Sequence, residues 1–214
     1  MWYHLHPRRL GLANLLTLLR IGVIPLFMLA YFYAHRRAEL GETGAARYYF
    51  LALALFGLAS LTDYLDGKVA RARGVTELGK FLDPVADKLL VLATLLAFKY
   101  WDGLIPIWMI AVFAGREVVV TLVRSLLVAR GERVISASMW GKVKTNTQMF
   151  ALVASFLLLI LNSAAGYPIE SVHSGRGPIF WMMLIPLALT VASGVEFFYS
   201  NRARLGRLTI RGNG

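Results

Sequence analysis

The sequence predicts an all-α, polytopic membrane protein with six transmembrane helices. Of its 214 residues, 57% are hydrophobic and only 16% are charged. Soluble globular domains carry about 25% charged residues, so this composition indicates a chain that folds mostly within lipid. Long runs without Asp, Glu, Lys or Arg recur along the chain, and a helix of about 20 mostly apolar residues crosses the hydrocarbon core of a bilayer.

Six helices account for these runs in order. The expected helices are 14–35, 46–71, 79–100, 104–129, 141–163 and 177–200, built around the uncharged runs 21–35, 48–62, 89–98, 103–115, 145–169 and 177–195. The second to fifth helices carry charges toward one end, from which long basic side chains can reach the interface. Residues 1–13 are expected to form an interfacial N-terminal segment and 201–214 a basic C-terminal tail. The whole chain, 1–214, is thus predicted to be a single membrane-embedded domain.

Basic residues favour one orientation of these helices. If the N-terminus lies in the cytoplasm, the outer segments hold only five of the 23 Lys and Arg residues, namely Arg36, Arg37, Arg47, Lys99 and Arg176. This asymmetry follows the positive-inside rule and predicts that both termini are cytoplasmic. The net charge of +11 then reflects topology and attraction to anionic headgroups. Because the basic residues are split among short loops, nucleic-acid binding is disfavoured, and the absence of cysteine excludes disulfides and thiolate catalysis.

Four aspartates stand out within the stretch DYLDGKVARARGVTELGKFLDPVAD, which covers residues 63–87. A helix turns by about 100° per residue, so positions three or four apart share a face. On the second helix this face carries Asp63, Asp66, Gly67 and Ala70, with Arg71 at its edge. On the third helix it carries Gly79, Asp83 and Asp87. The connection is short, so we expect antiparallel neighbours whose carboxylates meet at the cytoplasmic end.

Two interpretations of these aspartates are open at this point. Four unpaired carboxylates in lipid would cost on the order of 10 kcal/mol, so cations must compensate. In a structural salt-bridge cluster the compensating side chains would be Arg71, Arg73, Lys80 and Lys88. The alternative is a pair of hard divalent cations, Mg²⁺ or Mn²⁺, which prefer carboxylate oxygens and share their coordination with substrate phosphates. Gly67, Ala70 and Gly79 leave room for a bulky ligand, which favours a binuclear site for phosphate transfer.

The same stretch resembles the signature of the CDP-alcohol phosphotransferase family. That signature is Asp-x2-Asp-Gly-x2-Ala-Arg, then seven or eight residues, then Gly-x3-Asp-x3-Asp, and all eight fixed positions are present with a spacer of seven. The resemblance implies a six-helix membrane enzyme with the CDP-alcohol phosphotransferase fold, usually a homodimer. It further implies a multi-pass catalytic domain in the cytoplasmic (inner) membrane with its active site facing the cytoplasm. Such enzymes transfer a phosphatidyl group from CDP-diacylglycerol to an alcohol and release CMP.

The resemblance also implies a role for each signature position. Two divalent cations would be bound by four carboxylates, those of Asp63, Asp66, Asp83 and Asp87. Asp87 would in addition be the candidate general base, unless the metals acidify the acceptor hydroxyl themselves. The CDP moiety would lie against Asp66, Gly67, Ala70, Arg71 and Gly79. Among these, the small residues would allow close approach and Arg71 would contact the diphosphate.

Three further stretches resemble the family members that use glycerol 3-phosphate as acceptor: NLLTLLRIGVIPLF, FLDPVADKLLV, and GREVVVTLVR followed by WGKVKTNTQM. A site for this dianion needs fixed cations, and the candidates are Arg116, Arg124, Lys142 and Lys144. The two lysines lie about 200° apart on a helix, so only one is expected to face the site, and Lys142 is preferred. The alternative is an ordinary Glu117–Arg124 pair with lysines that reach the interface.

Other functions remain open on the sequence alone. LDPVADK also occurs in cardiolipin synthases that use CDP-diacylglycerol, so phosphatidylglycerol, inositol phosphate and serine are alternative acceptors. A small ion transporter would also place carboxylates between helices, but such sites usually lie at the midplane between repeated halves. No internal repeat is visible in this chain. A structural or interaction protein would need no convergent aspartates.

Overall fold

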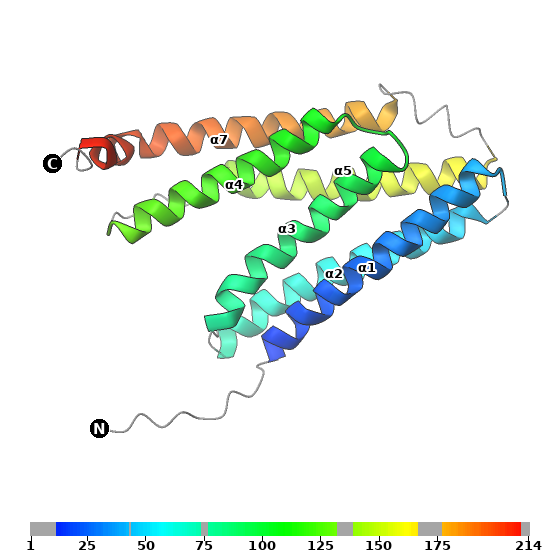
Figure 1. The fold of residues 1–214 in the computed structure, drawn as a ribbon, viewed down its shortest axis with the longest axis horizontal. Helices are drawn as coiled ribbons and strands as arrows, with labels where there is room; N and C mark the ends of the chain where they lie inside the picture. The colour runs from blue at the N-terminus through cyan, green and yellow to red at the C-terminus, as the bar shows by residue number, and fades with distance from the viewer. Residues whose placement is uncertain (1–11, 43, 74–76, 132–138, 167–176, 211–214) are drawn as a thin grey trace. The chain divides into compact units, whose positions relative to one another are not determined.

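The computed structural model describes residues 12–42, 44–73, 77–131, 139–166 and 177–210, and within these ranges the chain forms six helices and no strand (Figure 1). The helices are α1 (Leu12–Glu39), α2 (Ala45–Arg73), α3 (Glu77–Tyr100), α4 (Ile107–Ala129), α5 (Met139–Ala164) and α7 (Pro178–Ile210). For residues 12–17, 63–73, 77–87, 139–140, 142, 203 and 207–210 the description covers the backbone alone. The predicted all-α class is confirmed for the described residues.

Each of the six predicted helices is present with ends that differ from prediction by several residues, for example at the end of α1 at Glu39, and two of these differences have physical reasons. α4 begins at Ile107, after Pro106 in an extended conformation with φ −75° and ψ 153°, since a proline disfavours the helical conformation of the residue before it. α7 continues to Ile210, through most of the expected tail at 201–214. Basic residues near the C-terminus of a helix interact favourably with its dipole, so this basic segment can extend the helix. Residues 1–11 of the expected N-terminal segment lie outside the described residues.

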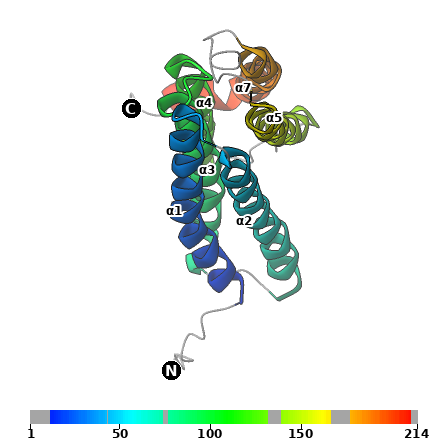
Figure 2. The ribbon, with the colours of Figure 1, turned by 90° about the vertical axis from the view of Figure 1, so that its right-hand side faces the viewer.

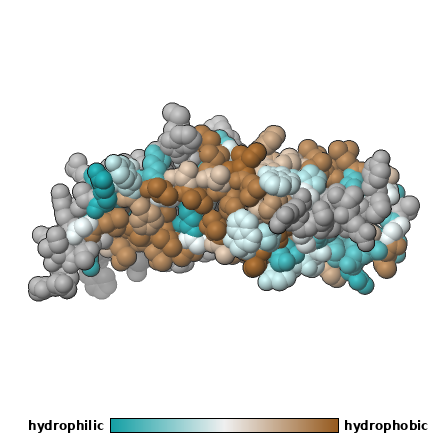
Figure 3. All heavy atoms as spheres, turned by 90° about the horizontal axis from the view of Figure 1, so that it is seen from above, coloured by the Kyte–Doolittle hydropathy of each residue, from teal (hydrophilic) through white to brown (hydrophobic). Residues whose placement is uncertain are grey.

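Four helical segments among the described residues are long and apolar enough to cross a membrane: Leu18–Glu39, Ala45–Thr62, Val143–Ala164 and Pro178–Arg202. α4 is not among these segments, and its apolar sequence contains three charged residues, Arg116, Glu117 and Arg124. Large apolar side chains also point away from the protein interior, and they cover much of the face seen in Figure 3. Such surfaces are unfavourable in water and favourable in lipid, so the chain is a membrane protein.

The chain divides into two compact units. The first contains Met1–Asp102 and Leu158–Ile169, and the second contains Gly103–Leu157 and Glu170–Gly214. In the first unit α1 packs along both α2 and α3 (Figure 2). The ring of Phe27 on α1 lies 6.4 Å from that of Phe56 on α2, and the ring of Tyr31 lies 5.9 Å from that of Phe98 on α3. These buried aromatic contacts fix α1 against both of its neighbours.

A buried carboxylate joins the same three helices at one end of the first unit. Asp102 follows α3 and is only 3% exposed. Its carboxylate accepts hydrogen bonds from the hydroxyl of Tyr31 and from that of Tyr49 on α2, the latter with an oxygen–oxygen distance of 3.2 Å. His35 Nδ1 lies 2.6 Å from the other carboxylate oxygen. Because a buried carboxylate is stable only when its oxygens are paired, this Asp102 cluster stabilises one arrangement of α1, α2 and α3.

Candidate functional site

The signature positions lie on two contacting helices of the first unit. Residues 63–71 belong to α2 and residues 79–87 to α3. The two helices contact each other and run in opposite directions (Figure 1), so the predicted antiparallel pair is confirmed. Side chains at 63–87 are outside the described residues, and the convergence of the four carboxylates stays a prediction. The residues with described side chains contain no other group of three acidic or histidine side chains that could hold a metal.

On α2, the spacing of the buried positions continues to the aspartates. Ala52, Phe56 and Ala59 are each at most 1% exposed, and they are spaced by four and three residues. On a continuous helix this spacing follows one face, because 3.6 residues complete a turn. The next positions of the same series are Asp63 and Asp66. The backbone of α2 therefore places both aspartates in line with the packed interior of the first unit.

The register of α3 leads to the same result from the other direction. Leu90, Thr94 and Phe98 are each at most 3% exposed and follow one another at intervals of four residues. Toward the start of the helix the same face continues through Asp87 and Asp83. Two acidic positions on each of two contacting helices thus lie on the extensions of two buried faces. A shared cation site also requires that the carboxylates of the two helices face each other, and this part of the expectation stays a prediction.

The four predicted acceptor-binding cations belong to the second unit, and Arg116 is held there by two contacts. Its Nη1 donates to Glu117 Oε1 at 3.1 Å, and its Nη2 donates to Ser193 Oγ of α7 at 3.0 Å. Gly194 makes room for this crossing, since a Cβ atom at that position would lie 3.4 Å from Arg116 Cγ. The Nε of Arg116 is buried and has no hydrogen-bond partner in the part of the chain that the structure describes. One donor of the guanidinium is therefore available to a ligand.

Lys144 is the lysine that the structure joins to Arg116. It is 5% exposed, and its Nζ donates to the same carboxylate oxygen of Glu117. Two cations thus contact the same carboxylate oxygen where α4, α5 and α7 are linked. The side chain of Lys142, the lysine preferred above, is outside the described residues. That Lys142 takes part in acceptor binding stays a prediction.

Arg124 is not part of this shared contact. Its guanidinium lies 5.8 Å from the centre of the Phe197 ring, which is a cation–π distance. The described contacts of Glu117 include Arg116 and Lys144, so the alternative of a simple Glu117–Arg124 pair is not supported by them. Ser193 could not be selected from the sequence, because a serine inside an apolar helix has no distinctive pattern.

Lys144→Met is expected to lower the stability of the second unit moderately. Glu117 is partly exposed and keeps Arg116 as a partner, so the loss should lie between that of an exposed pair and that of a fully buried one, about 1–2 kcal/mol. For a chain of this size that corresponds to a drop of roughly 2–8 °C in thermal midpoint. Lys99→Met, at the end of α3, is the control. Equal midpoints for Lys144→Met and the wild type would contradict a stabilising role for this pair.

Comparison with known proteins agrees with the residue patterns. A model of the CDP-alcohol phosphatidyltransferase family matches residues 10–195. The chain is 38% identical over 194 residues to the CDP-diacylglycerol–glycerol-3-phosphate 3-phosphatidyltransferase of Bacillus subtilis (strain 168), covering 89% of this chain and 95% of the relative. It is 37% identical over 188 residues to a probable phosphatidylglycerophosphate synthase of Mycobacterium tuberculosis (strain H37Rv), covering 87% and 79%. A cardiolipin synthase (CMP-forming) of Streptomyces coelicolor is 33% identical over 161 residues, covering 75% and 69%.

Proposed function

This chain belongs to the CDP-alcohol phosphatidyltransferase family, and from that premise we propose that it is a phosphatidylglycerophosphate synthase. It transfers the phosphatidyl group of CDP-diacylglycerol to glycerol 3-phosphate and releases CMP, a reaction of phospholipid biosynthesis. The observation that carries the proposal is the complete signature at 63–87, on two contacting helices whose buried faces extend through the aspartates. The names of the Bacillus and Mycobacterium relatives support the choice of acceptor.

The donor set suits a hard divalent cation. Asp63, Asp66, Asp83 and Asp87 offer carboxylate oxygens only, which Mg²⁺ and Mn²⁺ prefer over nitrogen or sulfur ligands. Two such cations, when bound, supply electrostatic stabilisation of the charge that develops on the transferred phosphate and on CMP. By fixing the positions of the bound cations, the four aspartates would hold CDP-diacylglycerol in place.

The remaining signature residues bind the nucleotide and move one proton. Gly67, Ala70 and Gly79 have small or absent side chains, so the CDP moiety can approach both helices, and Arg71 binds its diphosphate. The acceptor hydroxyl oxygen attacks the phosphorus that carries diacylglycerol, the bond from this phosphorus to the bridging oxygen breaks, and CMP leaves with that oxygen. Asp87 accepts the hydroxyl proton; divalent cations held by the four aspartates would also acidify this hydroxyl.

The acceptor phosphate is assigned to the cations of α4 and α5. Arg116 supports this assignment because its buried Nε has no partner among the described residues. Arg116 and Lys144 both contact the carboxylate of Glu117, so two cations lie close together there. Arg124 and Lys142 complete the proposed set. From the family resemblance, the enzyme is further proposed to act as a homodimer in the cytoplasmic membrane with its active site on the cytoplasmic side. The distribution of Lys and Arg predicts that both termini lie on that side too.

A second candidate reaction is cardiolipin synthesis, with phosphatidylglycerol as acceptor. The Streptomyces relative favours it, since that protein is named a cardiolipin synthase and matches 75% of this chain. Phosphatidylinositol-phosphate synthesis would use the same donor and signature with inositol phosphate. These reactions differ only in the acceptor, so an acceptor comparison separates them.

The test is CMP release by the purified protein in detergent, with CDP-diacylglycerol and either Mg²⁺ or Mn²⁺. Glycerol 3-phosphate, phosphatidylglycerol, inositol phosphate and serine are compared as acceptors. We expect release that requires both a divalent cation and glycerol 3-phosphate. Metal-dependent release with another acceptor would keep the aspartate site and overturn the acceptor assignment. If folded protein released no CMP with any of these acceptors, a salt-bridge or transport role of the aspartates would be favoured instead.

Arg124→Ala is expected to raise the KM for glycerol 3-phosphate about tenfold and to leave kcat nearly unchanged, because a cation that binds acceptor and transition state equally contributes uniform binding. The measurement is initial rate against acceptor concentration at saturating CDP-diacylglycerol. Arg37→Ala is the matched control, since Arg37 lies on α1 and pairs with Glu42 at 3.2 Å. Unchanged acceptor kinetics in Arg124→Ala would remove Arg124 from the site.

A further inference from the structure

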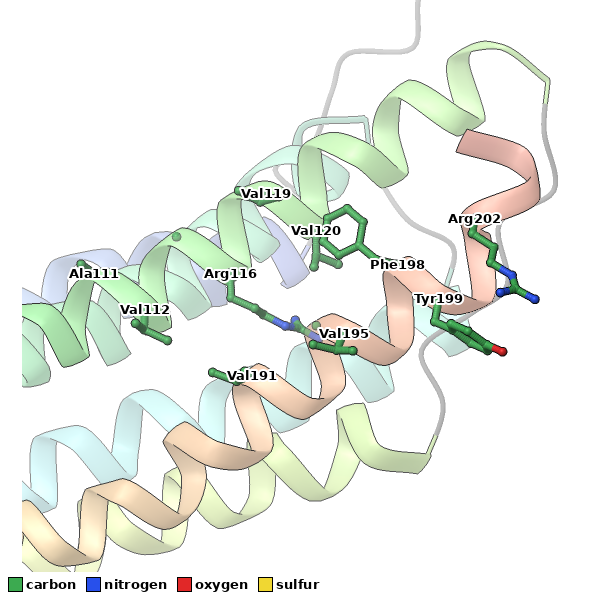
Figure 4. A pocket seen from close by; sticks show the side chains of 12 residues that line it. Ala111, Val112, Arg116, Val119, Val120, Val191, Val195, Phe198, Tyr199 and Arg202 are labelled. Carbon is green, nitrogen blue, oxygen red and sulfur yellow. The ribbon is translucent and has the colours of Figure 1, made fainter. Parts of the chain in front are cut away.

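An apolar groove lies between α4 and α7 in the second unit (Figure 4). Its volume is about 640 Å³, and its walls are formed mostly by valines of both helices, with Phe198 beside them. Val119 is 46% exposed and Val195 is 63% exposed, so both walls are open to the surroundings. Two arginines are the charged residues of the lining: Arg116 crosses between the helices, and Arg202 lies at one end.

Two glycines give the groove its depth. Gly115 lines it from α4 and Gly194 from α7. A Cβ atom at Gly115 would meet no other atom within 4 Å, so the space over that position is open. At Gly194 the space is used by the Arg116 side chain, which passes over α7 there. The groove therefore results from the packing of α4 against α7, and the Arg116 side chain that crosses between the two helices forms one of its boundaries.

The end of the groove has the features of a phosphate site at a membrane surface. The span of α7 that is apolar enough to cross a membrane ends at Arg202, so this residue belongs where lipid headgroups lie. Its guanidinium lies 4.3 Å from the centre of the Tyr199 ring, and both side chains are exposed. Arginine and tyrosine are the residues that bind phosphate and anchor helices at this depth. After Glu196 the chain contains four arginines and no acidic residue.

We propose that this groove binds an anionic membrane phospholipid, with an acyl chain along the α4 and α7 walls and the phosphate at Arg202. The apolar and open walls suit a hydrocarbon chain and exclude a water-soluble ligand. A second copy that docked through the same end of α7 would bring like charges next to Arg202, which disfavours that occupant. No signature residue lines the groove; Arg116, which is assigned above to the acceptor phosphate, does line it, whereas the lipid phosphate is placed at Arg202.

The experiment is native mass spectrometry of delipidated protein in detergent, with dioleoylphosphatidylserine or dioleoylphosphatidylcholine as the probe. Neither lipid is the donor or the proposed acceptor. We expect wild-type protein to retain phosphatidylserine roughly tenfold better than phosphatidylcholine, and Arg202→Gln to remove this preference, because a charge-assisted contact to the anionic headgroup is lost. Arg204→Gln removes the same charge two residues away, from a side chain that contacts Asn201 and does not line the groove, and should keep the preference.

Filling the groove tests the position of the acyl chain. Val195→Trp is expected to reduce retention of both lipids, whereas Val118→Trp, at a 55% exposed position of α4 outside the lining, should not. Gly115→Leu fills the groove from the other wall and serves if Val195→Trp does not fold. Equal retention of the two lipids by wild-type protein, or an unchanged preference in Arg202→Gln, would overturn the proposal. Displacement of phosphatidylserine by CDP-diacylglycerol but not by phosphatidylglycerol would also overturn it, since the groove would then hold the donor.

Discussion

Asp66→Asn and Asp83→Asn are each expected to lower the rate of CMP release by a factor of about 10² or more. Each substitution keeps the size of the side chain and removes one anionic oxygen ligand from a cation pair shared by α2 and α3. Removing a single group that stabilises transition-state charge typically costs about 10²–10³ in rate. The measurement is CMP release at saturating substrates over a range of Mn²⁺ concentrations. A partial recovery of the rate at high Mn²⁺ concentration would indicate a weakened metal site.

Glu42→Gln is the matched control for these two variants. It also neutralises an acidic residue, but at an exposed position whose partner is Arg37, so its activity should equal that of the wild type. The competing interpretation, a structural salt-bridge cluster, predicts the opposite pattern. In that case Asp66→Asn and Asp83→Asn would lower the thermal midpoint and leave the rate per folded molecule unchanged. Wild-type rates in both folded variants would exclude the aspartates from the reaction.

The helices and the signature were predictable because both depend on local sequence. A span is recognised from the length of an apolar run, and a shared helix face follows from spacing alone. The start of α4 shows the limit of this argument. A continuous uncharged run suggested a helix from residue 104, but Pro106 interrupts it and the helix begins at Ile107. Local backbone chemistry decided that boundary, and hydropathy does not record it.

Contacts between distant helices were not predictable in this way. Lys142 and Lys144 lie on different sides of α5, and spacing cannot tell which side meets α4. The packing of α5 brings Lys144 to Glu117, although Lys142 was the preferred candidate. His35 was similarly uninformative, since an isolated histidine near the end of a span has no pattern. Its contact with Asp102 joins residues 67 positions apart, and only the folded arrangement of α1 and α3 creates it.

Asp102→Ala is expected to be the most destabilising substitution at a residue outside the signature. The carboxylate is buried and accepts hydrogen bonds from Tyr31, Tyr49 and His35, and its loss leaves three donors inside the first unit without their acceptor. Removing one partner of a buried charged network costs about 3–5 kcal/mol, which is roughly 6–20 °C in thermal midpoint for a chain of this size. Thermal unfolding in detergent measures this effect, with Glu42→Ala as the exposed control.

The cause of that loss can be separated from a general packing defect by a double-mutant cycle with Tyr49→Phe. If the hydroxyl of Tyr49 acts through Asp102, its removal should cost stability in the wild type and almost nothing in Asp102→Ala. Additive losses would show that the two side chains act independently and would contradict the cluster. Asp102 follows the last residue of α3, whereas Asp83 lies near its start. At 1.5 Å per residue, the 17 positions from 83 to 100 span about 25 Å. At temperatures where Asp102→Ala is folded, its dependence on Mn²⁺ should therefore equal that of the wild type, which is the reverse of the result expected for Asp83→Asn.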